Sequence, residues 1–385
     1  MSDRIPGFTS TGSKRPAALF GDSAPDLPAR MVSARGAEVW DARGNRYTDY
    51  IMALGAVALG YAHPAVTRAV AGAAEAGVVG PLPPVLEDEL AHIISGRLPW
   101  IESLRFLKTG AEAMAAAVRI ARAHTGRSDV LGSGYHGWLD WAQAAGTPGV
   151  PAGAAISGTL PFNDVERGRA AIRAAGDRLA AVAFEPIVLG EPDGDWLRML
   201  REETHRTGAV LIIDEIKTGC RLAVGGATER YGLEPDLVVL GKAIANGLPL
   251  ALVGGRADVM QAATRTWISS TLATEFVSLA ACRATLEVME QSKVPAHLGR
   301  IGGRLMGGLR DLAARHTGLV RGVAGIPEMC FLEMDEADGI RLARGAARRG
   351  LLFKRSAYNF VSLAHDERAV DTTLATLEDA LSDRG

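Results

Sequence analysis

The sequence predicts an α/β protein that has a large domain with a mainly parallel sheet and a second, smaller α+β domain. Three observations carry this prediction: short apolar runs, helical patterns between them, and a length of 385 residues, which exceeds one small core. Continuous apolar strands that alternate with helices indicate a parallel sheet covered on both faces. The strands are expected near residues 128–132, 180–186, 209–214, 236–240 and 250–254.

The first part of the chain is predicted from turn signals and helical spacing. Residues 1–30 are rich in Pro, Gly and Ser and are expected to form an extended arm. Residues 38–50 alternate apolar and polar side chains around an Arg-Gly-Asn turn, which predicts a hairpin. A short strand is expected at 103–107, and helices at 64–77, 84–97 and 113–124.

The last part of the chain is predicted to leave the large domain. Residues 275–315 look helical, and residues 318–385 return to shorter strand and helix patterns. We therefore expect a large domain at 51–275 and a small domain that combines residues 1–50 with residues 276–385.

The composition is that of a globular protein and excludes several classes of function. With a net charge of −2, the chain lacks the basic surface of a nucleic-acid-binding protein. No apolar run approaches the roughly 20 residues of a membrane helix, and residues 1–10 lack the apolar core of a signal peptide. The three cysteines show no spacing typical of a metal site. We expect a cytoplasmic protein with reduced thiols and with no metal, nucleic-acid or membrane partner.

A lysine and an aspartate follow two buried strands, at the strand ends where open α/β sheets bind their ligands. Lys242 comes just after the run at 236–240, and Asp214 ends the run at 209–214. An amine that can form a Schiff base, beside an acid that keeps a cofactor nitrogen protonated, points to pyridoxal phosphate (PLP). Lys242 would then act as a general base whose pKa is lowered by burial and the cationic ring. Ile216 shares a strand face with Asp214 and would press on the ring.

Two further segments suit the phosphate and the ring of this cofactor. Thr109, Gly110 and Ala111 lie at a strand-to-helix junction, where the amides of the helix attract an anion. A plain helix start with Thr109 as the N-cap would give the same pattern. Tyr135 or His136, just after another strand, would supply a stacking partner for the ring, and ordinary core packing is the alternative.

With these residues the chain resembles the class III (subgroup II) aminotransferases of PLP fold type I, and most closely their glutamate-1-semialdehyde 2,1-aminomutase branch. The resemblance runs from about Gly36 to Glu290. Its motifs are Trp40–Tyr50, Gly60–Pro64, Tyr135–Gly137, Glu185-Pro186, Asp214–Gly219, Pro235–Leu237 and Gly241-Lys242. The resemblance implies a large domain with a seven-stranded-type sheet and a small α+β domain.

The resemblance also implies roles for individual residues. Lys242 is expected to be the Schiff-base lysine, Asp214 to pair with the ring nitrogen, and Tyr135 to stack on the ring. Residues 109–111 would surround the phosphate. Thr271 looks like the threonine that family members donate to the phosphate across a dimer interface, so a homodimer is implied.

Departures near the cofactor affect the expected substrate. Ala111 stands where family members usually carry Ser or Thr, so one phosphate hydroxyl is missing. Lys217 stands where relatives often place Gln or Met near the ring hydroxyl, and it either adds a second cation beside the cofactor or points away. Together with His136 and Glu185, it is a candidate for secondary contacts with the cofactor.

Two more departures concern the features that distinguish the aminomutases. Counting back from Gly36 places Ser33, with Arg30 and Arg35 nearby, where the aminomutases carry an arginine for the substrate carboxylate. The segment at 143–151 looks much shorter than the aminomutase loop that keeps the released intermediate enclosed.

We therefore expect a PLP-dependent aminotransferase that works by two half-reactions, through PLP and pyridoxamine phosphate. Its partners are a small amino donor and a keto or aldehyde acceptor, such as a keto sugar or a cyclic ketone. The alternatives are a glutamate-1-semialdehyde-type aminomutase and a PLP racemase. A non-enzymatic module would require loss of Lys242 or Asp214, and a dehydrogenase would need a GxGxxG turn that this sequence lacks.

Overall fold

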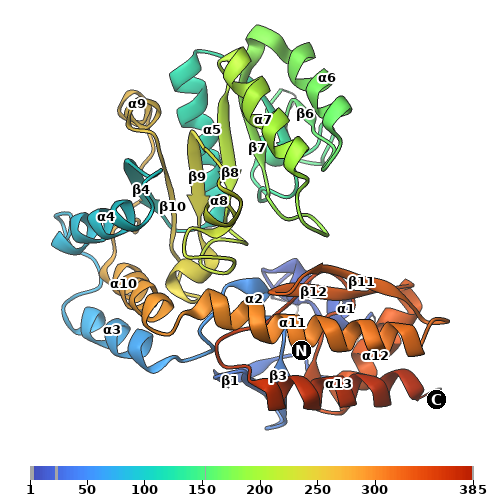
Figure 1. Cartoon of the computed structure of the whole chain (residues 1–385). Helices are drawn as coiled ribbons and strands as arrows, with labels where there is room; N and C mark the ends of the chain where they lie inside the picture. The colour runs from blue at the N-terminus through green and yellow to red at the C-terminus, as the bar shows by residue number, and fades with distance from the viewer. Residues whose placement is uncertain (1–3, 22–24, 152, 384–385) are drawn as a thin grey trace. The chain divides into compact units, whose positions relative to one another are not determined.

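The computed structural model describes residues 4–21, 25–151 and 153–383, which divide into two compact units (Figure 1). Unit 2 comprises residues 64–292, and unit 1 combines the segments on either side of it in the sequence. The second boundary lies at 292 and not at the expected 275. Helix α10 (Phe276–Gln291) packs against α3 (Pro64–Glu75) and α4 (Val85–Arg97), which keeps it in unit 2.

Unit 2 is built on a seven-stranded sheet with the strand order β4-β10-β9-β8-β7-β5-β6. Neighbouring strands from β6 to β9 are parallel, whereas β10 is antiparallel to both β9 and β4. The predicted α/β class and the mainly parallel sheet are therefore confirmed. The strands are β4 (Ser103–Leu107), β5 (Asp129–Ser133), β6 (Gly158–Thr159), β7 (Leu179–Phe184), β8 (Val210–Asp214), β9 (Leu237–Leu240) and β10 (Ala251–Gly255).

The reversal at β10 follows from a short connection. A parallel strand would need a crossover of a dozen or more residues, usually through a helix. Between β9 and β10 the chain has only residues 241–250, which contain the single 3₁₀ turn η4 (Lys242–Ala245). The segment that carries Lys242 is therefore a compact turn between two antiparallel strands.

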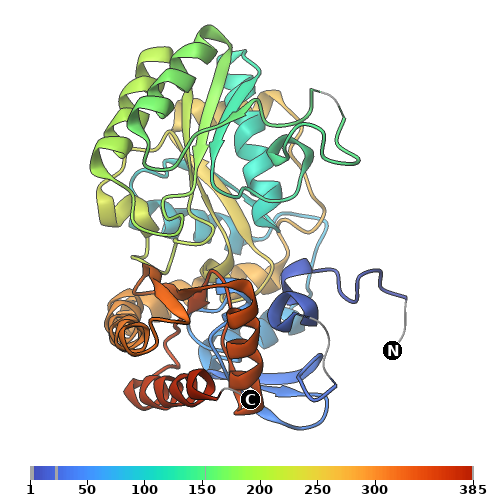
Figure 2. The same ribbon diagram turned by 90° about the vertical axis from the view of Figure 1, so that its right-hand side faces the viewer.

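Helices cover both faces of this sheet, and alternate strand residues face each layer (Figures 1 and 2). Ile212 and Val239 pack in the cluster that contains α5 (Gly110–Thr125). Leu211 and Ile213 pack in the opposite cluster, with α6 and α7. The remaining helices of unit 2 include α6 (Val165–Ala175), α7 (Gly194–Thr207), α8 (Gly226–Tyr231) and α9 (Ala257–Met260). Burial on both faces explains why these strands are continuously apolar.

Unit 1 contains two smaller sheets, with the strand orders β1-β2-β3-β13 and β11-β12-β14. The predicted hairpin is formed by β2 (Glu38–Asp41) and β3 (Arg46–Asp49). The other strands are β1 (Met31–Arg35), β11 (Val320–Ile326), β12 (Met329–Met334), β13 (Leu351–Leu352) and β14 (Asn359–Phe360). The helices are α1 (Pro16–Phe20), α2 (Met52–Gly55), α11 (Val294–Arg315), α12 (Glu336–Arg348) and α13 (Glu367–Ser382). None of the helices in the described parts of the chain is long and apolar enough to cross a bilayer.

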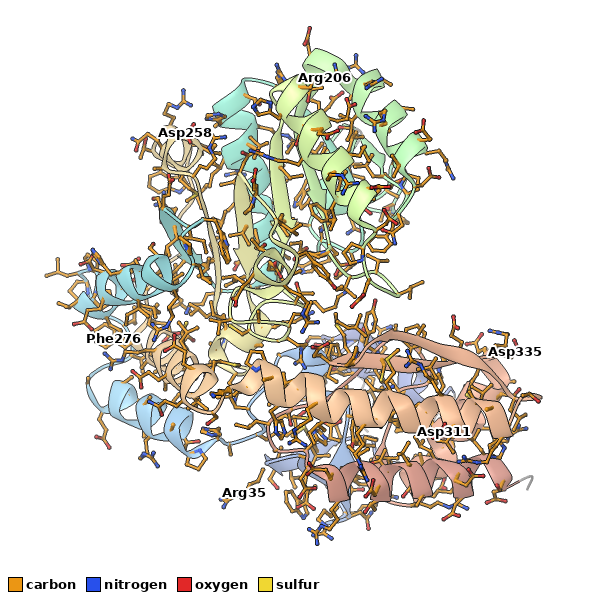
Figure 3. The ribbon with its side chains drawn as sticks, viewed as in Figure 1. Arg35, Arg206, Asp258, Phe276, Asp311 and Asp335 are labelled. Atoms are coloured by element: carbon orange, nitrogen blue, oxygen red, sulfur yellow. The ribbon has the colours of Figure 1, made fainter. Side chains whose placement is uncertain are left out.

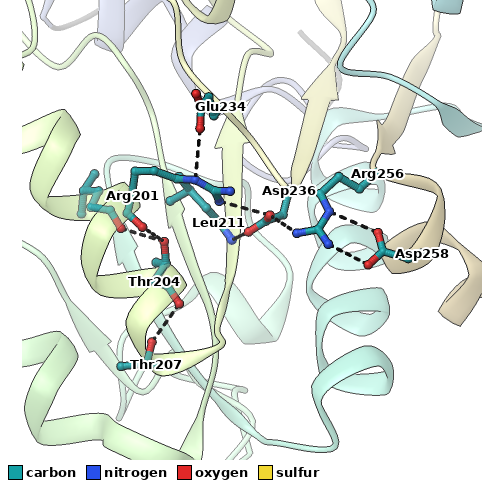
Figure 4. Close-up of polar contacts among 9 residues, drawn as sticks. Arg201, Thr204, Thr207, Leu211, Glu234, Asp236, Arg256 and Asp258 are labelled. Carbon is teal, nitrogen blue, oxygen red and sulfur yellow. Dashed lines mark hydrogen bonds and ion pairs between the residues drawn. The ribbon is translucent and has the colours of Figure 1, made fainter.

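A charged network fixes the N-terminal end of β9 in unit 2 (Figure 4). The buried carboxylate of Asp236 accepts hydrogen bonds from Arg201 at 3.1 Å and from Arg256 at 2.9 Å. Its second oxygen accepts a bond of 2.8 Å from the backbone N–H of Leu211 on β8. Arg256 also donates to Asp258. These contacts tie α7 and the neighbouring strands together at the edge opposite Lys242.

Candidate active site

The predicted lysine and aspartate meet at the C-terminal edge of the sheet in unit 2. Asp214 ends β8, and Lys242 follows the adjacent parallel strand β9 by two residues. Lys242 has a φ of +47°, a left-handed conformation that costs a non-glycine residue about 1–3 kcal/mol. Burial lowers the pKa of its amine, and the charge of Lys217 lowers it further. The backbone of this turn is therefore strained, and the Lys242 amine loses its proton more easily than an ordinary lysine does.

The carboxylate of Asp214 is buried and held from two sides. One oxygen accepts a hydrogen bond of 3.1 Å from the backbone N–H of Ile216. The other lies 2.8 Å from Nδ1 of His136, which is equally buried and donates to it. The His136 ring stacks on Trp141 with a centroid distance of 6.0 Å. The structure thus makes His136 a partner of Asp214, a contact that the sequence did not indicate.

The predicted phosphate site lies at the N-terminus of α5. Thr109 is the N-cap, and with Glu112 it forms a capping box. The motif is therefore a helix start, as the alternative interpretation of the sequence predicted. In this capping box the Glu112 carboxylate accepts from the N–H of Thr109, and the Thr109 hydroxyl oxygen accepts from the N–H of Glu112. The N–H groups of Gly110 and Ala111 are first-turn donors that have no partner inside a helix, and an anion can bind them.

Two glycines allow the segments of this site to approach each other closely. A Cβ atom on Gly110 would lie 2.7 Å from the side chain of Ile216. A Cβ atom on Gly137, whose φ is +101°, would lie 2.7 Å from that of Ala111. The start of α5 therefore lies against both the end of β8 and the loop after β5. These three segments are the ones that the sequence assigned to the cofactor.

Tyr135, Glu185 and Lys217 form a second line of contacts. One carboxylate oxygen of Glu185 accepts a bond of 2.8 Å from the backbone N–H of Tyr135, and the other lies 2.9 Å from Nζ of Lys217. The Lys217 side chain is only 11% exposed and pairs with Glu185, and its orientation toward the cofactor stays a prediction. The Tyr135 side chain is exposed, as is Thr271 in the turn before α10.

No structural role was predicted for two charged residues that follow Asp214, namely Glu215 and Arg221. Glu215 points to the opposite side from Asp214, where Thr218, Ala227 and Thr228 donate to its fully buried carboxylate. Burial raises the pKa of Glu215. The hydrogen bonds that it accepts hold the loop after β8. Arg221 is fully buried and acts electrostatically on Lys242. Its place soon after Asp214 was the only available signal.

The expected carboxylate-binding region belongs to unit 1. Ser33 and Arg35 lie on β1 of unit 1, where both are exposed (Figure 3). Arg30 donates to the backbone oxygen of Phe8 at 2.9 Å, and its guanidinium lies over the Phe8 ring. Arg30 therefore has a local structural contact.

The residues of unit 2 fit PLP chemically. Free amides at the start of α5 suit a phosphate, a buried carboxylate suits a protonated ring nitrogen, and a readily neutral lysine suits an aldehyde. The side chain of Ile216 supplies an apolar surface between the first two groups, because it contacts the region of Gly110 and follows Asp214. All of these groups belong to one unit, which holds them in register.

Comparisons with known proteins identify relatives along nearly the whole chain. The family model for aminotransferase class-III matches residues 21–381, further than the region of the motifs. The glutamate-1-semialdehyde 2,1-aminomutase of Pyrobaculum arsenaticum is 36% identical over 92% of this chain and 92% of its own length. The enzyme of the same name from Thermus thermophilus is 35% identical over 98% of this chain and 96% of its own length.

The solved structures extend this similarity to the fold. The FumI protein of Sphingopyxis sp. MTA144, in its PLP internal aldimine form, has a TM-score of 0.92 at 27% identity and covers 98% of this chain and 93% of that chain. A transaminase with PLP bound has a TM-score of 0.89 at 26% identity and covers 98% of this chain and 94% of its own. The predicted fold type I is confirmed by these neighbours.

Proposed function

Because the chain belongs to the class-III aminotransferase family, we propose that it transfers an amino group between two small molecules in separate half-reactions. Its cofactor is PLP, which alternates with pyridoxamine phosphate. The observation that carries the proposal is the pair of Asp214 and Lys242 on adjacent strand ends, with a pKa of Lys242 that is lowered by burial. When bound, PLP supplies an aldehyde that takes up an amine and a ring that withdraws electrons from the substrate carbon.

Each protein group has a defined task in this proposal. Lys242 binds the cofactor through Nζ and, when released, moves a proton as general base. His136 and the N–H of Ile216 hold the carboxylate of Asp214 in place, and this carboxylate favours protonation of the ring nitrogen. The amides of Gly110 and Ala111 bind the phosphate, and Tyr135 stacks on the ring.

The acceptor in this proposal is a keto or aldehyde compound such as a keto sugar or a cyclic ketone. Two features argue against the usual carboxylate substrate: Ser33 at the position expected for an arginine, and the short segment at 143–151. The alignment with the Thermus aminomutase spans 415 positions, more than the 385 residues of this chain, so the relative has internal residues that this chain lacks. A shortened enclosing loop favours release of the intermediate and transfer to a second substrate.

Internal amino transfer is the second candidate function, because both curated relatives with about 35% identity are named aminomutases. In either case we propose a homodimer in which Thr271 of each protomer reaches the cofactor phosphate of its partner. The exposure of Thr271 and of the large side chains Trp267 and Leu272 beside it supports such a contact.

The test is the absorbance spectrum of the PLP-loaded protein during addition of single amino donors, with Lys242→Ala as the control. We expect one donor to convert the PLP band to the pyridoxamine phosphate band in the wild type, with no conversion in the variant. Acceptors can then be screened against the pyridoxamine form. Efficient isomerisation of glutamate semialdehyde without an added donor would instead establish the aminomutase function.

A further inference from the structure

Lys217 forms a buried ion pair with Glu185 that the proposed mechanism does not use. Nζ of Lys217 lies 2.9 Å from Oε1 of Glu185, and the two side chains are 11% and 12% exposed. Desolvation makes such a pair costly, so it is weak support for stability alone. Its position three residues after Asp214, on the loop that follows β8, suggests a role in the site.

The pair is held in one geometry by neighbouring backbone. Oε2 of Glu185 accepts from the N–H of Tyr135 at 2.8 Å, and the N–H of Glu185 donates to the carbonyl of Ser133 at 2.9 Å. Gly134, with a φ of +103°, leaves space for this carboxylate, because a Cβ atom there would lie 2.5 Å from Oε2. Glu185 is therefore anchored, and it holds the Lys217 side chain in place.

Two cations and two carboxylates act electrostatically on the Lys242 amine. Glu185 and Asp214 raise its pKa, whereas Lys217 and Arg221 lower it, and burial lowers it most. Of the four, Lys217 has the largest effect. A neighbouring cation favours the neutral form of an amine, and only the neutral form attacks a carbonyl carbon.

We propose that Lys217 is a positioning residue of this enzyme: its ammonium, fixed by Glu185 at the edge of the sheet where Asp214 and Lys242 follow adjacent strands, favours the neutral, nucleophilic form of the Lys242 amine. This inference rests on the proposed role of Lys242 as the lysine that binds PLP. It gives a reason for a lysine at the position where relatives often have Gln or Met. The cation acts on the free amine, so its effect is present before any substrate binds.

The test measures how fast Lys242 captures PLP in the apoprotein as a function of pH. Short pulses of PLP are followed by borohydride, which reduces the C=N bond formed with loss of water, and the labelled lysine is located by peptide mass spectrometry. The variants are Lys217→Met, which removes the cation, and Lys217→Arg, which keeps it. Lys217→Gln replaces the Met variant should that protein not fold.

We expect Lys217→Met to move the midpoint of the rate profile to higher pH and to slow capture at pH 7 about tenfold, the effect of a tenfold change in proton affinity. Lys217→Arg should stay within about threefold of the wild type at every pH. The matched control is Lys108→Met, because Lys108 forms an equally buried pair with Glu275, at 2.6 Å, and is not one of the charges that act most strongly on the pKa of Lys242. Its midpoint should equal that of the wild type.

The outcomes separate this inference from the proposed function. Labelling of Lys242 with the same midpoint in wild type and in Lys217→Met would overturn the role of Lys217 and leave the role of Lys242 intact. Absence of label at Lys242 in the wild type would contradict the proposed function itself. A raised midpoint in Lys217→Met that Lys217→Arg restores supports both.

Discussion

The two ends of strand β9 carry charged side chains with opposite kinds of neighbours. At the N-terminal end, buried Asp236 is bound by two arginines of the opposite charge and by a backbone N–H (Figure 4). At the C-terminal end, Lys242 lies in a left-handed turn, and burial together with the cations Lys217 and Arg221 lowers the pKa of its amine against the opposing effect of two carboxylates. The charge of Asp236 at the N-terminal end is balanced by its partners, whereas the backbone at Lys242 is strained.

This difference separates stability from reactivity within one short strand. A satisfied ion network favours the charged form of its members and holds the surrounding elements together. Burial and like charges disfavour the charged form of Lys242, and its backbone conformation is costly. Such features cluster at functional sites. The comparison predicts that substitutions at the two ends have opposite effects on folding and on activity.

The largest effect is expected for Lys242→Ala at the reactive end. The variant loses both the group that binds PLP and the general base, so the transamination rate should fall about 10³-fold or more. The measurement is the rate of the donor half-reaction in a single turnover. Asp236→Asn is the control and should keep nearly full activity at a temperature where it is folded. Retention of a tenth of the activity by Lys242→Ala would contradict the assignment.

The second effect concerns the satisfied end. Asp236→Asn removes the negative charge that pairs with Arg201 and Arg256. Because both arginines are partly exposed, the expected cost is that of lost charge-assisted hydrogen bonds, about 1.5–3 kcal/mol. Urea unfolding should show this as a lower midpoint with an unchanged slope. Asp214→Asn, at the other end of the sheet, is the comparison and should lose activity with a smaller loss of stability. The same stability loss in both variants would show that the two ends do not differ.

Much of this arrangement could be predicted from local sequence. Lys242 and Asp214 each follow an apolar run, and adjacent parallel strands bring such ends together. The phosphate segment was recognisable because Thr109 and Glu112 form a helix start and Gly110 follows. The mainly parallel sheet followed from strands that are apolar on both faces.

The rest depends on contacts between segments that are distant in the sequence. His136 and Asp214 are separated by 78 positions, and no local pattern joins them. The same holds for Lys217 and Glu185, so the orientation of Lys217 could not be decided. The boundary after α10 was also missed, because helical spacing from 275 to 315 does not reveal that Phe276–Gln291 packs on α3 (Figure 3).

The third prediction concerns the effect of the lowered pKa of Lys242 on the stability of the apoprotein. Its pKa is lowered in the folded state, so between the folded value and the unfolded value of about 10.4 only the unfolded chain carries the proton. The wild type therefore loses stability as the pH falls through this window. Lys242→Met lacks this loss, so it should be more stable at pH 7, by about 1.4 kcal/mol for each tenfold change in proton affinity. The gap should close as the pH approaches 10, and a gap that is independent of pH would refute the lowered pKa.

The smallest effect is expected where stability and function share a residue. Thr109 caps α5 through its hydroxyl, so Thr109→Ala should lower the free energy of unfolding by about 1 kcal/mol, whereas Thr109→Ser should retain the cap. If the helix start also binds the phosphate, PLP raises the stability of the folded state in proportion to its affinity, and Thr109→Ala should gain less from added PLP than Thr109→Ser does. Thermal unfolding with and without PLP measures both terms. An equal gain in the two variants would mean that Thr109 belongs only to the helix, and that the phosphate depends on the amides of Gly110 and Ala111 alone.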